Sequence, residues 1–152
     1  DQSPLYSQIR LSEPWDSPHN AQFHETWPYP FRCPAQETKQ KQVAYLAVID
    51  THTLWPGTAC RSLRECVDGT SRTILVIEVA ASGTHWMQPR DLELAEVSGV
   101  INGDMAKSIS SQHVGGAHVV LADGAVRFLD TSTTESTIQS LRLIDDGQPN
   151  NF

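Results

Sequence analysis

The fold is decided by a stretch that reads Ala117-His118-Val119-Val120-Leu121-Ala122-Asp123-Gly124-Ala125-Val126-Arg127-Phe128-Leu129. Two runs rich in β-branched and apolar residues flank an Asp-Gly pair, which is a strong short-range signal for a β-hairpin. A two-residue type I′ turn needs a positive φ at both central residues, and Asp-Gly suits it. The stretch therefore predicts an antiparallel hairpin with a type I′ turn at Asp123-Gly124.

Two further runs extend this hairpin into a sheet. Residues 43–49 and 73–79 are apolar and β-rich, and the second run contains Thr73-Ile74-Leu75-Val76-Ile77-Glu78-Val79. Apolar residues at helical spacing favour short helices over 91–97 and 133–144, and a third short helix is expected over 20–26. We therefore expect an α+β fold, in which an antiparallel β-sheet with a C-terminal β-hairpin carries short helices and long loops.

The chain divides into three parts by composition. Residues 1–40 hold six of the nine prolines and two of the four tryptophans. Proline at this density blocks long helices and central strands, so we expect an extended segment packed on the body. Residues 41–145 form the predicted sheet domain, and residues 146–152 form a polar tail.

Charge and composition exclude several classes of partner. The 152 residues carry 11 Lys and Arg against 18 Asp and Glu, a net charge of −7 with 39% hydrophobic residues. This is a globular composition, and its acidic balance argues against binding nucleic acid or an anionic membrane surface. The longest apolar stretches, residues 43–49 and 74–81, are far shorter than the roughly 20 residues a membrane helix needs. We expect no membrane contact from this part of the protein.

The cysteines leave three arrangements open. Cys60 and Cys66 close a short loop and are a candidate disulfide, because disulfides often staple exported domains locally. A pair that uses Cys33, or no disulfide at all, is also consistent with three cysteines. No Cys-x2-Cys pair is present to favour a structural zinc site.

His113 is the first candidate for chemistry. Gly115 and Gly116 follow it and let the backbone turn sharply into the hairpin, so His113 is expected at the open end, away from Asp123-Gly124. Its ring would make a structural hydrogen bond or bind a ligand. We expect no cofactor. If the acidic residues bind an ion, calcium would suit them best. Candidate metal ligands are Asp68, Asp104, Asp123 and His113.

The sequence gives little support for an enzymatic function. No Gly-x-Ser-x-Gly elbow is present, and no histidine is placed by sequence next to Cys33. We therefore expect a non-enzymatic protein. A metal-dependent hydrolase using His85, His113 and His118 is the least favoured alternative.

Four tryptophans have three possible roles. Trp15, Trp27, Trp55 and Trp86 would serve as buried anchors, as parts of a protein interface, or as a platform for a glycan. The glycan role belongs to a second functional hypothesis, an extracytoplasmic module that binds a glycan or another solute.

Ordered motifs carry a family resemblance. Nine residues separate His113 from Asp123-Gly124. This His-x9-Asp-Gly pattern closely resembles the C-terminal signature of planctomycete-type pilin-like proteins, a family assigned to a domain of unknown function. Four other segments resemble motifs of the same family, in the same order: Pro14-Trp15-Asp16-Ser17-Pro18-His19-Asn20, Phe31-Arg32-Cys33-Pro34, Asp68-Gly69-Thr70-Ser71-Arg72-Thr73-Ile74, and His85-Trp86-Met87-Gln88-Pro89-Arg90-Asp91-Leu92.

The resemblance implies an exported subunit. Members of the family begin with a prepilin-type leader and a long hydrophobic helix, and a prepilin peptidase cleaves and methylates them at this end. They are similar to type II secretion pseudopilins, some of which are stabilised by calcium. Asp1-Gln2-Ser3 looks like the middle of such a protein. The expected function is therefore an extracytoplasmic filament or cell-surface subunit, located at the surface, outside the cell or in the periplasm. Its expected partners are copies of itself or other pilin-like subunits.

Overall fold

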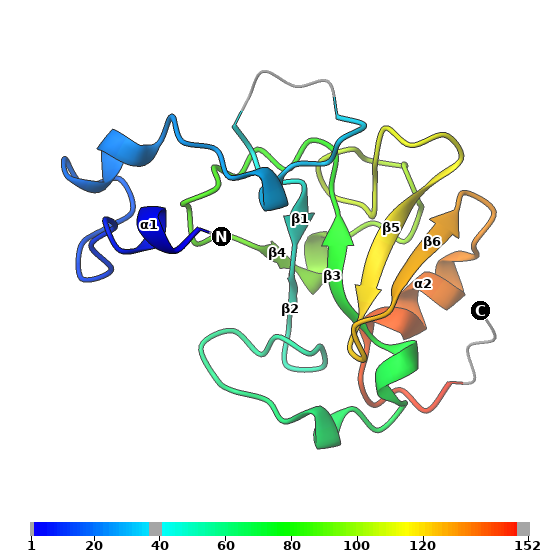
Figure 1. Cartoon of the computed structure of the whole chain (residues 1–152). Coiled ribbons are helices and arrows are strands. Elements are labelled where there is room, and N and C mark those ends of the chain that lie inside the picture. The colour runs from blue at the N-terminus through cyan, green and yellow to red at the C-terminus, as the bar shows by residue number, and fades with distance from the viewer. Residues whose placement is uncertain (1, 37–40, 149–152) are drawn as a thin grey trace.

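A four-stranded antiparallel sheet forms the centre of the protein (Figure 1). The structure is a computed structural model that describes residues 2–36 and 41–148. The strands lie in the order β1 (Tyr45–Leu46), β3 (Ile74–Glu78), β5 (Gly116–Leu121) and β6 (Val126–Asp130). Short helices and long loops surround this sheet, which confirms the predicted α+β class.

The predicted hairpin is confirmed, but its predicted turn type is wrong. The Leu121 N–H donates to the Ala125 carbonyl and the Gly124 N–H donates to the Leu121 carbonyl, both at 2.9 Å. Gly124 has φ 86°, whereas Asn102 is the one non-glycine residue with a positive φ in the described part of the chain. Asp123 therefore cannot occupy a type I′ turn. The loop has three residues, and its pattern is that of a type I turn closed by a left-handed glycine.

The run 43–49 does not form one strand. Tyr45 and Leu46 within this run form β1, and its last two residues form β2 (Val48–Ile49), which pairs in parallel with β4 (Leu92–Glu93) in a separate small sheet. The helix expected over 91–97 is wrong, because Leu92 and Glu93 pair with β2 as a strand. The Asp91 carboxylate accepts a hydrogen bond from the Ala47 N–H at 2.8 Å, and β4 then continues into a single 3-10 turn, η5 (Leu94–Glu96).

The C-terminal helix covers one face of the sheet. α2 (Glu135–Arg142) confirms the helix predicted over 133–144, and the Thr134 side chain caps it by accepting from the Thr137 N–H. Its apolar residues pack with the inward-facing residues of β3, β5 and β6. The resulting core includes Ile77, Val79, Ala117, Val119, Leu121, Leu129, Ile138 and Leu141.

The N-terminal segment contains single turns rather than long helices, as its prolines predict. They are α1 (Ser3–Tyr6), η1 (Asn20–Phe23) and η2 (Tyr29–Phe31), so the helix expected over 20–26 is one 3-10 turn. This segment lies to one side of the sheet in Figure 1. The other turns are η3 (Leu63–Glu65) and η4 (Thr70–Arg72).

Part of the polar tail is held by the body. The Asp68 carboxylate accepts from the N–H groups of Asp146 and Gly147 at 2.8 and 3.0 Å. Residues 37–40 and 149–152, parts of the predicted segments 1–40 and 146–152, lie outside the described residues. Among the described residues, no helix combines the length and apolar character needed to cross a membrane.

Candidate functional site

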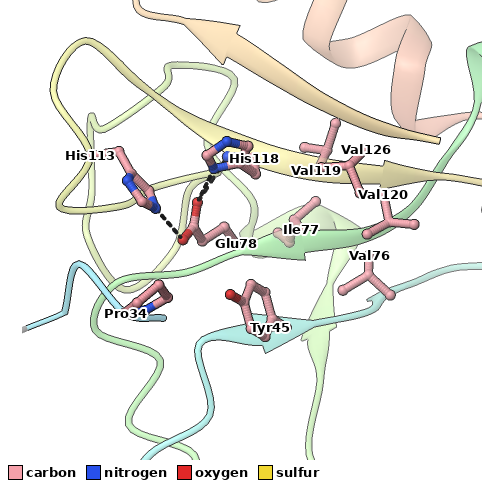
Figure 2. A pocket seen from close by; sticks show the side chains of 10 residues that line it. All are labelled: Pro34, Tyr45, Val76, Ile77, Glu78, His113, His118, Val119, Val120 and Val126. Carbon is pink, nitrogen blue, oxygen red and sulfur yellow. Dashed lines mark hydrogen bonds and ion pairs between the residues drawn. The ribbon is translucent and has the colours of Figure 1, made fainter. Parts of the chain in front are cut away.

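A cavity of about 430 Å³ lies on the face of the sheet opposite α2 (Figure 2). The strands supply its walls because alternate side chains point to opposite faces of a sheet. Its floor is apolar, with Val76, Val120 and Val126 at one end. The other end carries the ionisable side chains of Glu78, His113 and His118, with Tyr45 and Pro34 beside them. The site thus combines an apolar floor with one polar end.

Glu78 is the centre of the polar end. Only 1% of its surface is exposed, and its two carboxylate oxygens have separate partners. Oε2 accepts from the backbone N–H of His118 at 2.9 Å and lies 3.3 Å from the ring atom His118 Nδ1. Oε1 lies 3.5 Å from His113 Nε2. A buried carboxylate needs such partners, because leaving it unpaired in a dry environment would be very costly.

A β-bulge places Glu78 on the cavity face. The pairing of β3 with β5 shifts register between Ile74 and Val76. Ile74 and Ile77 are both in the buried core, although an odd spacing in a regular strand would put them on opposite faces. Beyond the bulge, Ile77 lies opposite Val119, which brings Glu78 next to β5 on the open side.

Cys33 completes the cluster from the N-terminal segment. Its Sγ lies 3.4 Å from His113 Nε2, and the residue is buried. Burial and the neighbouring Glu78 carboxylate raise the pKa of this thiol to about 11. Burial, with the nearby Cys33 and Glu78 groups, also raises the pKa of Tyr45 to about 12. The sequence-based view that no histidine accompanies Cys33 is therefore wrong.

The loop before β5 fixes His113. Ser111 accepts from the His113 N–H at 3.0 Å and donates to the Gly116 carbonyl at 2.7 Å. Gly115 has φ 86°, in agreement with the sharp turn expected there. Gly116 has no room for a side chain, since an added Cβ would lie 2.1 Å from the Leu129 carbonyl oxygen. His113 consequently sits at the open end of the hairpin, as predicted.

The cluster presents three kinds of metal-binding atom in one place. The ligand atoms of Cys33, Glu78 and His113 all lie within 4.8 Å of one another. His118 joins them through an edge-to-face contact with the His113 ring, with centroids 4.8 Å apart. This arrangement can hold a metal ion, or it can act as a hydrogen-bonded network that orients the histidines.

The predicted acidic ligands are not brought to His113. Asp104 Oδ1 accepts from the Ala106 N–H at 2.8 Å, and Asp123 Oδ1 accepts from the Ala125 N–H at 2.9 Å. Asp68 holds the tail, as described above. The carboxylates of Asp104 and Asp123 each stabilise their own turn, which is the usual role of an aspartate beside glycine. The structure thus separates Asp68, Asp104 and Asp123 from the cluster around His113.

His85 also lies apart from His113 and His118. Its ring packs against Trp15 and His24, at centroid distances of 5.4 and 4.7 Å, and these two rings also stack on each other. Its Nε2 pairs with the His24 carbonyl at 3.2 Å, and burial lowers its pKa. The histidine set expected for a hydrolase therefore divides into two groups, of which only His113 and His118 share the site.

Two tryptophans line a second cavity of about 320 Å³. Trp15 comes from the N-terminal segment and Trp86 from the loop before β4, and Arg10, Glu13 and Asn20 lie with them. The Asn20 side chain ties this segment together, accepting from the Arg10 N–H and donating to the Arg10 carbonyl at 3.0 Å each.

The other two tryptophans lie elsewhere. Arg32 packs over the Trp27 ring at 4.6 Å. Trp55 is 42% exposed, and its Nε1 donates to the Leu75 carbonyl at 2.7 Å. The four rings therefore do not form one common platform.

All three cysteines are free, so the candidate Cys60–Cys66 disulfide is not formed. Cys66 is buried in a small core cluster and its Sγ donates to Thr73 Oγ1 at 2.9 Å, whereas Cys60 is exposed. Of the three arrangements left open by the sequence, the structure has the one without a disulfide.

Sequence reasoning missed the grouping of Cys33, Glu78 and Tyr45 around His113. One signal was present. Glu78 is the single charged residue in the apolar run 73–79, and an acid inside a central strand demands a partner. The identity of that partner depends on segments far apart in the chain.

Comparison with known proteins gives a family match over part of the chain. No curated protein and no solved structure matches it significantly. One family model, SBP_bac_10, described as a protein of unknown function (DUF1559), matches residues 80–136, which is less than half of the chain. The matched part contains His113 and both strands of the hairpin. The hairpin region of this chain is thus similar to a family of unknown function.

Proposed function

We propose that this chain is the globular domain of a non-enzymatic, pilin-like subunit that is exported and joins a filament or a cell-surface assembly. One observation carries the proposal. One face of the sheet packs against α2, whereas the described residues leave the apolar opposite face largely open. An apolar face of this kind marks a docking surface.

The open face is apolar where it is most exposed. Val126 is 61% exposed and Phe128 is 45% exposed, both on β6 at the edge of the sheet. Val76, Val120 and Tyr45 continue the surface towards β1. In contrast, Leu129 of the same strand is 2% exposed because it faces the core. The sheet therefore has a second apolar side that suits an added helix.

The proposed occupant is the hydrophobic N-terminal helix that the resemblance implies, from a part of the protein outside the present sequence. Packed on the open face, this helix would form the core of the assembly, and the loops of the domain would form its outer surface. The partners would be further copies or other pilin-like subunits, in an extracytoplasmic location. The resemblance to prepilin-processed proteins supports this role.

The test uses the intact protein with its natural N-terminal region. Val126→Asp places a charge on the open face, and Val67→Asp is the matched control, because Val67 is 78% exposed on a loop. We expect Val126→Asp to abolish co-sedimentation of the protein with assembled filaments while Val67→Asp leaves it unchanged. An intact protein that carries an ordinary signal peptide, or a Val126→Asp variant that assembles normally, would contradict the proposal.

A solute-binding role is the second candidate, and the cavity between Trp15 and Trp86 favours it. Two aromatic faces beside the Arg10 and Glu13 side chains are suited to stack on a sugar and bind its hydroxyl groups. Titration of tryptophan fluorescence with neutral and acidic oligosaccharides tests this role. A saturable change that Trp86→Ala removes would support it, and a flat response to every sugar would count against it.

A further inference from the structure

We propose that Cys33, Glu78 and His113 bind a zinc ion whose fourth coordination position opens towards the cavity on the sheet. The site joins three segments that are distant in sequence: the N-terminal segment, the end of β3 and the loop before β5. Figure 2 shows His113 and His118 converging on the Glu78 carboxylate at the end of the sheet. This site is independent of the proposed assembly role.

The interatomic distances fit tetrahedral zinc. With Zn–S of about 2.3 Å and Zn–N of about 2.05 Å, tetrahedral angles put sulfur and nitrogen about 3.6 Å apart; for nitrogen and a carboxylate oxygen the value is about 3.3 Å. In the structure, Cys33 Sγ and His113 Nε2 are 3.4 Å apart. His113 Nε2 and Glu78 Oε1 are 3.5 Å apart. Two of the three pairs of ligand atoms therefore already have the spacing of corners of a zinc tetrahedron, and all three atoms lie within 4.8 Å of one another.

The donor set selects the type of metal. One thiolate, one imidazole and one carboxylate suit zinc or a similar borderline transition metal. Calcium takes six to eight oxygen ligands, whereas among the described residues this cluster supplies a single carboxylate. Three protein ligands with one position left for water or a solute is the pattern of an open zinc site, whereas closed structural sites use four protein ligands.

Neighbouring groups hold the ligands in place. Glu78 Oε2 accepts from the His118 backbone N–H and faces His118 Nδ1, so the carboxylate keeps its orientation while Oε1 faces His113 Nε2, its partner ligand in the proposed site. Ser111 fixes the backbone of His113. Such outer partners orient metal ligands and commonly change metal affinity by about 10- to 100-fold when they are removed. His118 is therefore a positioning residue of this site.

The site is also reachable. The His113 side chain is 30% exposed and the His118 side chain is 40% exposed, whereas Glu78 is almost fully buried. A metal ion can thus enter from the cavity side and meet a buried carboxylate.

The experiment measures zinc binding by the chain freed of metal with a chelator. Competition with a chromophoric zinc indicator gives the affinity, and elemental analysis after gel filtration gives the stoichiometry. We expect one zinc per chain, weakened more than about 100-fold by Cys33→Ser and by His113→Gln, and about 10- to 100-fold by His118→Ala. Cobalt substitution is expected to give thiolate-to-cobalt charge-transfer absorption that Cys33→Ser removes.

Matched controls separate this site from surface binding. Cys60→Ser removes an exposed thiol and His52→Gln removes an exposed histidine that faces Asp145, so both should bind zinc as the parent chain does. Circular dichroism and melting temperature show whether each variant folds. Failure of the folded chain to bind one zinc at micromolar concentration would overturn the proposal. Equal affinity in the parent chain and in folded His113→Gln would also overturn it.

Discussion

Replacing Gly116 with alanine is the sharpest test of how the hairpin is built. Gly116 lies at the start of β5, paired with Asp130 of β6. A Cβ added there would stand 2.1 Å from the Leu129 carbonyl oxygen and 2.8 Å from the Phe128 ring. The oxygen belongs to the backbone, so it cannot move aside as a flexible side chain would. The two strands must separate where the hairpin joins the loop of His113.

The expected cost follows from the size of this clash. Overpacking a well-packed position costs about 1–3 kcal/mol, and a contact with rigid backbone places this variant near the upper end, at about 3 kcal/mol. For a chain of this length, that loss lowers the melting temperature by about 6–12 °C. The assay is thermal unfolding followed by circular dichroism.

Gly115→Ala is the control for this prediction. Gly115 has φ 86°, but nothing lies within 4 Å of its added Cβ, so the change introduces backbone strain without a clash. We expect it to cost about 1–2 kcal/mol, clearly less than Gly116→Ala. Equal melting temperatures for the two variants, or a Gly116→Ala variant that melts like the parent, would refute the reasoning.

Three further predictions concern the turn, the core and the thiols. Gly124→Val should lower the unfolding free energy by at least about 1–2 kcal/mol, since a β-branched residue resists φ 86°; an unchanged denaturant midpoint would contradict this. Ile138→Ala should cost about 2–5 kcal/mol, because Ile138 is fully buried between α2 and the sheet, and a loss below 1 kcal/mol by urea unfolding would exclude that packing. In the chain freed of metal, iodoacetamide should modify exposed Cys60 first at pH 8 and buried Cys66 slowly. Cys33 should react appreciably only as the pH approaches its pKa of about 11, and mass spectrometry of the digested protein would reveal a contrary order.

The sequence predicted the elements whose signals are local. The hairpin, β3 and α2 each follow from a run of neighbouring residues with a turn or a cap beside it. The turn type failed because Asp-Gly also fits a three-residue loop, in which only the glycine needs a positive φ. The helix expected over 91–97 failed because Asp91 binds the distant Ala47 N–H, and no periodicity in the segment reports that contact.

The polar end of the cavity was harder to predict, because its residues come from segments that are far apart in the sequence. His113 was identified from its motif, but Cys33 lies 80 residues away in the sequence and reaches it through the path of the N-terminal segment. Glu78 was visible as an isolated acid in an apolar strand. Its side of the sheet depends on the bulge between Ile74 and Val76, which the pattern of apolar residues did not reveal.

The position of Glu78 argues for a function rather than for stability. An apolar residue at position 78 would avoid the desolvation of a buried carboxylate, as the apolar residues of the core on the α2 side do. Its burial is tolerable because His113 and His118 lie against both oxygens. The two proposed roles therefore fall at different ends of the cavity, docking at the apolar end with Val126 and metal binding at the polar end. Folded variants that lose zinc through His113→Gln should accordingly keep the docking surface, and Val126→Asp should keep the zinc.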